Sequence, residues 1–318
     1  MEEKSRILKK INNECFGGSE NQLRLLLKYL PDKSFKDINL ILNNTDHDLL
    51  EKNRINILWM QHFINQEQAK NLGSGDYVDK LDYIVFNSNW NFEKYQYQFK
   101  IPESKSTVIR NAVENIDLHE KPKDKINLIY HTTPWRGLAQ LLNVFENLNL
   151  EKVELNVCSS TIIYGKKFDG ILGKKYQNLF DKCKDTKNVN YLGFVENSKV
   201  IELLKKTHIY AYPSIWPETS CISAIESMAA GCSVVTTNLG ALYETCSTFG
   251  TLVCFDSNLD NLEKKYKKTL LNSIQNYWTE ENQKKLKLQT EIINATYSWK
   301  LRSVEWENFF RDVKKSKF

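Results

Sequence analysis

The segment YPSIWPETSCISAIESMAAGCSVVTTN, residues 212–238, decides the fold because it links two apolar strands through one helix. The run IYAY at 209–212 predicts a short buried strand. Two prolines follow and cannot continue the strand, because proline donates no ladder hydrogen bond. The β-branched run SVVTT at 233–237 predicts the next strand.

A helix is predicted between these two strands. Thr219 and Ser220 are good N-caps, so we expect the helix to begin there. It should run to Ala230 and stop at Gly231, because glycine readily adopts the left-handed conformation that ends helices.

Two glutamates stand out in this apolar setting. Glu218 lies just before the predicted helix, and Glu226 lies eight residues later, about 12 Å along a helix axis. A helix start offers free N–H groups and a positive dipole end, which suit a phosphate. One carboxylate could then bind a sugar and the other the ribose hydroxyls of a nucleotide. In the alternative, Glu226 is an ordinary helix residue and Glu218 only pairs with the helix dipole.

Strand-like runs recur along the chain and alternate with helical stretches such as 21–30 and 137–148, which indicates parallel sheets with helices on both faces. The polar stretch 114–125 separates two series of strands. The predicted strands are 38–42, 55–60, 83–87, 106–109, 126–130, 153–158, 189–192, 209–212, 233–237 and 251–255.

We therefore expect an α/β protein of two doubly wound, Rossmann-like domains that face a central cleft. The first domain is predicted at 1–116 and the second at 117–296. A C-terminal helix at 297–318 should return to the first domain. Its apolar residues Trp299, Val304, Trp306 and Phe310 are the predicted anchors. Ligands of such sheets bind at the carboxyl ends of the strands.

Composition excludes several classes of protein. The formal charge of +5 over 318 residues is too weak to argue for nucleic acid. Seven cysteines, without a CxxC pair, are typical of free thiols in a reducing compartment. No apolar run approaches 18 residues, so we expect a cytoplasmic protein, with peripheral contact to a membrane left open.

The segment 188–245 resembles the retaining glycosyltransferases of family 4, which have the GT-B fold and an E-x7-E motif. The likeness lies in Pro-Ser, Pro-Glu, seven residues, Glu-Ser-Met-Ala-Ala-Gly and the strand that follows. STVIRNAVE at 106–114 resembles the interdomain segment of the family. The first hundred residues resemble it less.

The resemblance implies a role for each matching residue. Glu218 would contact the donor sugar near its anomeric carbon, as a catalytic residue, and Glu226 would hold the donor ribose. The other donor-binding residues implied by the motif are Thr219, Ser220, Cys221, Ile222 and Val195, the last in a loop beside the base.

TTPWRGLAQLL at 132–142 resembles the loop of the family that carries a basic residue before glycine. Arg136 would neutralise a departing diphosphate, with Thr133 nearby. The family often has a second cation a few residues earlier, and here the chain reads His131-Thr132-Thr133 instead. In the alternative, Arg136 is an ordinary surface residue at a helix start.

The first half of the chain offers three further candidates. FGGSENQLRLLL at 16–27 resembles a glycine-rich loop in which Gly17 and Gly18 let backbone approach the donor or acceptor, although a simple turn capped by Ser19 explains it as well. The stretch 5–15 before it is a poor strand. His62 stands where the family often has a histidine near the acceptor, and it can equally be structural.

The function implied is transfer of a hexose, with retention, from a UDP- or GDP-linked sugar to a hydroxyl on a glycan, lipid or protein. No HExxH motif or Cys/His ligand cluster occurs, so we expect neither a metal nor a cofactor besides the nucleotide-sugar. The alternative is a non-catalytic protein of the same fold that binds nucleotide-sugars or carbohydrate.

Overall fold

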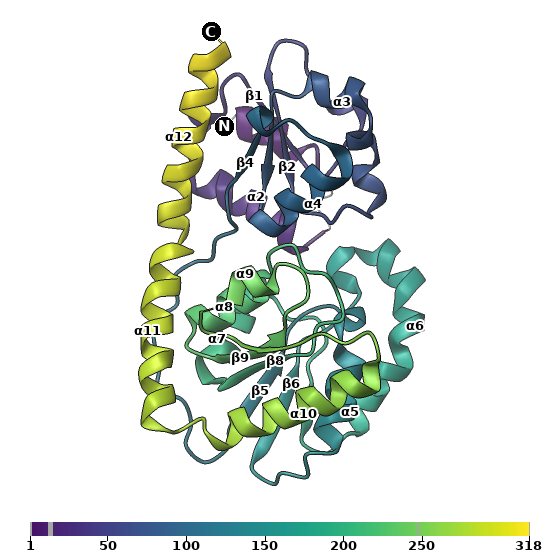
Figure 1. Ribbon diagram of the computed structural model, residues 1–318, viewed down its shortest axis with the longest axis vertical. Coiled ribbons are helices and arrows are strands. Elements are labelled where there is room, and N and C mark those ends of the chain that lie inside the picture. Colours follow the sequence, from purple (N-terminus) through teal and green to yellow (C-terminus); the bar gives the residue numbers. More distant parts are fainter. Residues whose placement is uncertain (1, 12–14, 247, 318) are drawn as a thin grey trace. The chain divides into compact units, whose positions relative to one another are not determined.

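The computed structural model describes residues 2–11, 15–246 and 248–317, which form two compact units (Figure 1). The first unit contains Met1–Ala112, Glu218–Ser220 and Tyr297–Phe318. The second contains Val113–Pro217 and Cys221–Thr296.

The first unit is built on a four-stranded parallel sheet with the strand order β1-β2-β3-β4. Helical segments connect each of its first three strands to the next, as parallel pairing requires. The elements are α1 (Glu2–Leu8), α2 (Gly18–Tyr29), β1 (Ile38–Leu42), β2 (Ile55–Met60), α3 (Gly75–Lys80), β3 (Tyr83–Phe86), α4 (Asn89–Phe99), β4 (Ser106–Val108) and α12 (Trp299–Lys317).

Alternate residues of this sheet enter two hydrophobic cores, one on each face. Ile57 and Trp59 of β2 belong to one core, and Leu58 and Met60 belong to the other. All four side chains are fully buried. The period-two alternation of strand side chains explains the near-continuous apolar sequence of the strand.

Helix α12 closes the first of these cores (Figure 1). Trp306 packs edge-on against Trp59 of β2, with ring centroids 4.8 Å apart. Trp299 and Phe310 are buried with it, as the sequence predicts. The predicted anchor Val304 is wrong, because this side chain is 52% exposed. It lies off the helical stripe that carries the three aromatic anchors.

The second unit is a six-stranded parallel sheet with the order β10-β9-β8-β5-β6-β7. Its helix α5 packs with α10, and α8 packs with α11. The elements are β5 (Ile126–Tyr130), α5 (Leu138–Glu146), β6 (Val153–Val157), α6 (Lys166–Asp185), β7 (Val189–Tyr191), α7 (Asn197–Lys206), β8 (Ile209–Tyr212), α8 (Ile222–Ala229), β9 (Ser233–Thr237), α9 (Leu242–Cys246), β10 (Thr251–Val253), α10 (Leu259–Gln275) and α11 (Glu280–Thr296).

The direction of winding reverses between β5 and β8. From β5 the chain moves outward through β6 to β7, and from β8 it moves the other way through β9 to β10. Ligands of doubly wound sheets bind at such a switch point, outside the carboxyl ends of the two strands. The loops after β5 and β8 are therefore the first place to look for a site.

Polar side chains secure the carboxyl end of α8. Lys121 Nζ donates to the carbonyls of Leu204 and Ala230, at 2.8 Å in both cases. Gln289 Nε2 donates to the carbonyl of Met228 (3.0 Å), and Asn294 Nδ2 to that of Ala229 (3.0 Å). These donors satisfy carbonyls that the end of a helix leaves without partners.

Asn294 also binds both backbone groups of Ile116. The N–H of Ile116 donates to Asn294 Oδ1 (2.9 Å), and Asn294 Nδ2 donates to the carbonyl of Ile116 (3.0 Å). The stretch that follows the crossover into the second unit is thereby fixed to α11 and α8.

The sequence-based strands are all present within the described residues, and several end one or two residues earlier than expected. Ahead of the glycine loop, the described residues begin with helix α1. Part of the poor strand suspected at 5–15, namely 12–14, lies outside the described residues.

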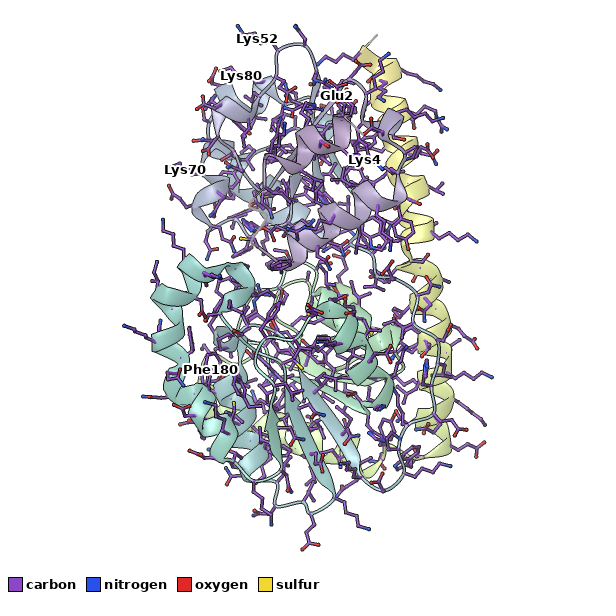
Figure 2. All side chains as sticks on the ribbon, turned by 180° about the vertical axis from the view of Figure 1, so that it is seen from behind. Glu2, Lys4, Lys52, Lys70, Lys80 and Phe180 are labelled. Atoms are coloured by element: carbon purple, nitrogen blue, oxygen red, sulfur yellow. The ribbon has the colours of Figure 1, made fainter. Side chains whose placement is uncertain are left out.

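Several lysines of the first unit are solvated. Figure 2 shows Lys52, Lys70 and Lys80 directed away from its body, and all three are exposed. In the part of the chain that is described, no helix combines the length and the apolar character needed to cross a bilayer. All seven cysteines are free thiols.

We expect Asn294→Ala to lower the free energy of unfolding by about 1–3 kcal/mol, because it leaves the buried backbone groups of Ile116 without partners. Thermal and urea denaturation measure the loss. Asn276→Ala is the matched control, since its amide is exposed and bonds only to Asn272. Equal stability of the two variants would contradict the anchoring role of Asn294.

Candidate functional site

The loop after β5 approaches the loop after β8 very closely. Gly137 has φ +129°, which L side chains rarely adopt, and a Cβ there would lie 2.3 Å from the carbonyl oxygen of Pro213. The N–H of Ile215 donates to the carbonyl of Arg136 (3.1 Å). The switch point is thus bridged by backbone, and only glycine fits at the point of contact.

Thr133 and Arg136 lie in this first loop. Tyr130 Oη and the N–H of Arg136 both donate to the carbonyl of Thr133, at 2.8 and 3.2 Å. Thr133 is buried, and its Oγ1 has no hydrogen-bond partner among the described residues. Hydrogen bonds to the carbonyl of Thr133 therefore fix the shape of the loop, which presents Arg136 just before Gly137, the N-cap of α5.

The guanidinium of Arg136 is held over an aromatic ring. Its Cζ lies 5.6 Å from the ring centroid of Trp216, a cation–π geometry. Trp216 stands in the loop after β8, where Ser214 Oγ donates to the carbonyl of Trp216 (2.9 Å). Thr237 Oγ1 in turn donates to the carbonyl of Ser214 (2.8 Å). The cation is thus positioned by the neighbouring loop as well as by its own.

Helix α8 begins later than the sequence predicts. Its N-cap is Cys221, with φ 64° and ψ 74°, and the first helical residue is Ile222. The prediction that Thr219 or Ser220 caps the helix is wrong, because the left-handed turn at Cys221 separates them from it. The end is closer to the prediction: the helix stops at Ala229, and Gly231 takes the left-handed conformation with φ 73°.

The late start changes the position of Glu226. It is the fifth residue of α8 and lies about 6 Å along the axis from Ile222, so it stands about one turn into the helix rather than two. Its Oε1 accepts a hydrogen bond from Asn197 Nδ2 (2.8 Å). Burial raises the pKa of Glu226 to about 7, and the bond from Asn197 opposes that rise. The carboxyl group is therefore poised between its neutral and charged forms at physiological pH.

Val195 lies in the loop between β7 and α7, and its side chain is half-buried. Gly193 turns this loop with φ 63°. Glu196 is the N-cap of α7, so Asn197 is the first residue of that helix. The loop that holds Val195 is therefore tied to α8 through the bond between Asn197 and Glu226.

The tripeptide Glu218–Ser220 groups with the first unit, although the residues on both sides of it belong to the second. Glu218 and Ser220 are buried, with 5% and 4% of their surface exposed. Thr219 is half-buried. The roles expected of these three residues at a donor sugar stay predictions.

The remaining candidates belong to the first unit. Gly17 is the N-cap of α2 and Gly18 its first residue, so Ser19 lies inside the helix and does not cap it. His62 follows β2 by two residues, and its carbonyl accepts hydrogen bonds from Asn91 Nδ2 (3.3 Å) and Tyr95 Oη (3.1 Å). These candidates lie at a helix start and beyond a strand end, as the sequence predicts.

In the second unit, the structure places the predicted residues Thr133, Arg136 and Cys221 in the loops around the switch point, and Ile222 and Glu226 in helix α8. Sequence reasoning missed three of their neighbours. The ring of Trp216 packs against the guanidinium of Arg136, and Asn197 donates a hydrogen bond to Glu226. His131 forms a hydrogen bond with Ser227 of α8. One feature of the sequence could have pointed to Trp216, namely its position between two prolines in the loop after a predicted strand.

His131 stands near the place where the family often has a second cation, and it carries no charge there. Burial lowers its pKa to about 3, so the ring is neutral at physiological pH. The described residues contain no group of three or more His, Cys, Asp or Glu side chains that could hold a metal ion.

Comparison with known proteins identifies this arrangement. A family model described as "Glycosyl transferases group 1" matches residues 113–287, more than half of the chain. A search of curated proteins finds no match.

Several solved structures have the same two-sheet fold. A glycosyltransferase from Rickettsia africae ESF-5 is 16% identical, with a TM-score of 0.66 over 96% of this chain and 84% of that one. Alr3699/HepE of Anabaena, in complex with UDP and glucose, is 15% identical, with a TM-score of 0.64 over the same shares of the two chains. Sucrose-phosphate synthase from Thermosynechococcus elongatus is 16% identical, with a TM-score of 0.64 over 84% and 69%. The predicted GT-B fold is confirmed.

We expect Gly137→Ala to destabilise the second unit by at least about 2 kcal/mol, because the new Cβ collides with the Pro213 carbonyl and the backbone conformation is strained. Thermal denaturation measures the loss. Gly170→Ala is the matched control, since a Cβ there meets nothing within 4 Å. A Gly137→Ala protein as stable as this control would show that the two loops do not meet as described.

Proposed function

The chain belongs to the group 1 glycosyl transferases, and on that premise we propose that it transfers a hexose, with retention, from a UDP- or GDP-linked sugar to an acceptor hydroxyl. The observation that supports this most is the switch point of the second sheet, which carries a cation, a helix start and a buried carboxyl group together. A nucleoside diphosphate needs a partner of each kind.

The diphosphate has two sources of positive potential in this proposal. The first N–H groups of α8 have no acceptor within the helix, and the helix dipole places partial positive charge at the same end. Arg136 adds a full charge that it keeps at any physiological pH. Thr133, with its buried hydroxyl, and the turn through Cys221 and Ile222 complete the phosphate side.

The nucleoside lies behind the phosphates. Glu226 accepts hydrogen bonds from the ribose hydroxyls, with Asn197 holding its carboxyl group in place. The loop through Val195 passes the base and contacts it mainly through backbone. The relative from Anabaena was solved with UDP and glucose, which supports a UDP-linked donor for this chain.

The chemical step needs no nucleophile from the protein. The bond between the anomeric carbon and the diphosphate oxygen breaks, and the acceptor oxygen bonds to the same face of the carbon. The acceptor proton passes to the departing diphosphate. Arg136 and the start of α8 stabilise the charge that develops on the leaving group, and Glu218 stabilises positive charge near the anomeric carbon.

Acceptor recognition falls to the first unit in this proposal. His62 follows the end of β2, and Gly17 and Gly18 open α2 with backbone that a ligand can approach. The acceptor class is a hydroxyl on a glycan, a lipid or a protein.

Incubation with a panel of UDP- and GDP-sugars tests the proposed function. We expect slow release of free nucleotide by hydrolysis with one donor, and faster release when the correct acceptor is added. Tight binding of a nucleotide-sugar without release, across glycan, lipid-linked and peptide acceptors, would instead indicate a non-catalytic binding protein.

Glu218→Ala should reduce transfer by about a hundredfold or more while UDP affinity changes little, because the carboxylate acts on charge that exists only in the transition state. Steady-state kinetics and calorimetric titration with UDP separate the two effects. Glu202→Ala is the control, since Glu202 is exposed and forms an ion pair with Lys205. Normal transfer by Glu218→Ala would place the catalytic site elsewhere.

UDP affinity should rise between pH 6 and pH 8 more steeply in the wild-type protein than in Glu226→Gln. The pKa of Glu226 is raised to about 7 by burial, so the charged form grows from about one tenth to about nine tenths over this range. The charged form is the better acceptor for ribose hydroxyls. Ionisation of UDP itself affects both proteins alike, so identical slopes would remove Glu226 from the ribose site.

A further inference from the structure

His131 is the first residue after β5, and it opens the loop that carries Arg136. Its ring packs edge-on against Tyr210 of β8, with centroids 4.8 Å apart and planes at 60°. Its Nε2 lies 2.9 Å from Ser227 Oγ of α8. His131 thus directly follows β5, while its side chain contacts both β8 and α8.

The hydrogen bonds determine which nitrogen of His131 carries the proton. Ser227 Oγ donates its only proton to the carbonyl of Ser223 (2.7 Å). The hydroxyl can therefore only accept from the ring, so Nε2 is the protonated nitrogen of a neutral imidazole. His131 then acts as a fixed donor, and it is neither a cation for phosphate nor a proton source at physiological pH.

The acceptor side of this network is the first turn of α8. Ser223 is the second residue of the helix, and its Oγ lies 2.8 Å from Tyr210 Oη and 3.4 Å from Cys221 Sγ. Ser227 lies one turn further on the same face and is fully buried. The direction of the free N–H groups at the helix start is thus set by contacts with His131 and Tyr210.

We propose that His131 is a positioning residue whose hydrogen bond to Ser227 locks the Arg136 loop and the first turn of α8 into one register, so that both bind the donor diphosphate together. This inference rests on the proposed function. In it, the neutral ring of His131 aligns the Arg136 loop, which follows β5, with the first turn of α8, which follows β8.

The alternative is that His131 only fills space between β5 and α8. Two substitutions separate these roles. His131→Phe keeps an aromatic ring against Tyr210 and removes the hydrogen bond, whereas His131→Gln keeps a donor and removes the ring. Ser227→Ala removes the same bond from the side of the helix.

The experiment is a double-mutant cycle on UDP affinity, measured by calorimetry at pH 7.5. We expect His131→Phe and Ser227→Ala each to weaken UDP binding about fivefold to tenfold, which corresponds to the loss of about one hydrogen bond. The double variant should bind no more weakly than the worse single variant, because both changes remove one interaction. His131→Gln should recover most of the affinity.

Two matched controls belong to the cycle. Ser273→Ala removes a similar bond from a helical serine to the carbonyl four residues earlier, in α10. His208→Gln alters a second histidine of the same unit, which is buried, lies just before β8 and bonds to Asn127 and Pro122. Neither control should change UDP affinity, although His208→Gln should lower the melting temperature.

Wild-type affinity in His131→Phe, or additive losses in the double variant, would overturn the inference and leave the proposed function standing. A wild-type protein that binds neither UDP nor GDP would remove both. If His131→Phe does not fold, as judged by near-UV circular dichroism, Ser227→Ala decides: a loss that Ser273→Ala does not share supports the inference, and unchanged affinity refutes it.

Discussion

The anchorage of α8 at its carboxyl end is the constraint on which the rest of the second unit depends. A helix of eight residues is too short to be stable alone, so its position must come from its surroundings. Lys121, Gln289 and Asn294 bind the carbonyls at its end, and the Lys121 ammonium also complements the negative end of the helix dipole. These contacts hold the opposite end of α8 at the switch point.

The charge near the start of α8 depends on the protonation of three side chains. Arg136 brings a permanent positive charge and is stacked on Trp216, while His131 is neutral because burial lowers its pKa. Glu226 is the one acidic group of α8, and burial raises its pKa toward neutrality. Arg136 and the dipole of α8 therefore both supply positive charge at the switch point, which suits a diphosphate.

Much of this architecture could be predicted from the sequence, for a physical reason. Strands buried on both faces read as continuous apolar runs, so INILWM and SVVTT were recognisable without any structure. Gly231 was recognisable as a helix stop because few other residues adopt its conformation at low cost.

What could not be predicted depends on contacts between distant parts of the chain. The left-handed conformation of Cys221 has no local signal, so the start of α8 was placed too early. Burial lowers the pKa of His131 and raises the pKa of Glu226, and this burial comes from tertiary packing that periodicity does not reveal. Val304 was mistaken for a buried anchor of α12 because it is apolar, although its side chain is exposed.

A crystal structure with UDP bound tests the central claim most directly. The account predicts that the two phosphates lie against the N–H groups at the first turn of α8, within hydrogen-bond reach of Arg136, and that the ribose hydroxyls meet the carboxyl group of Glu226. A nucleotide bound away from the carboxyl ends of β5 and β8, with Glu226 making no contact to it, would contradict the account.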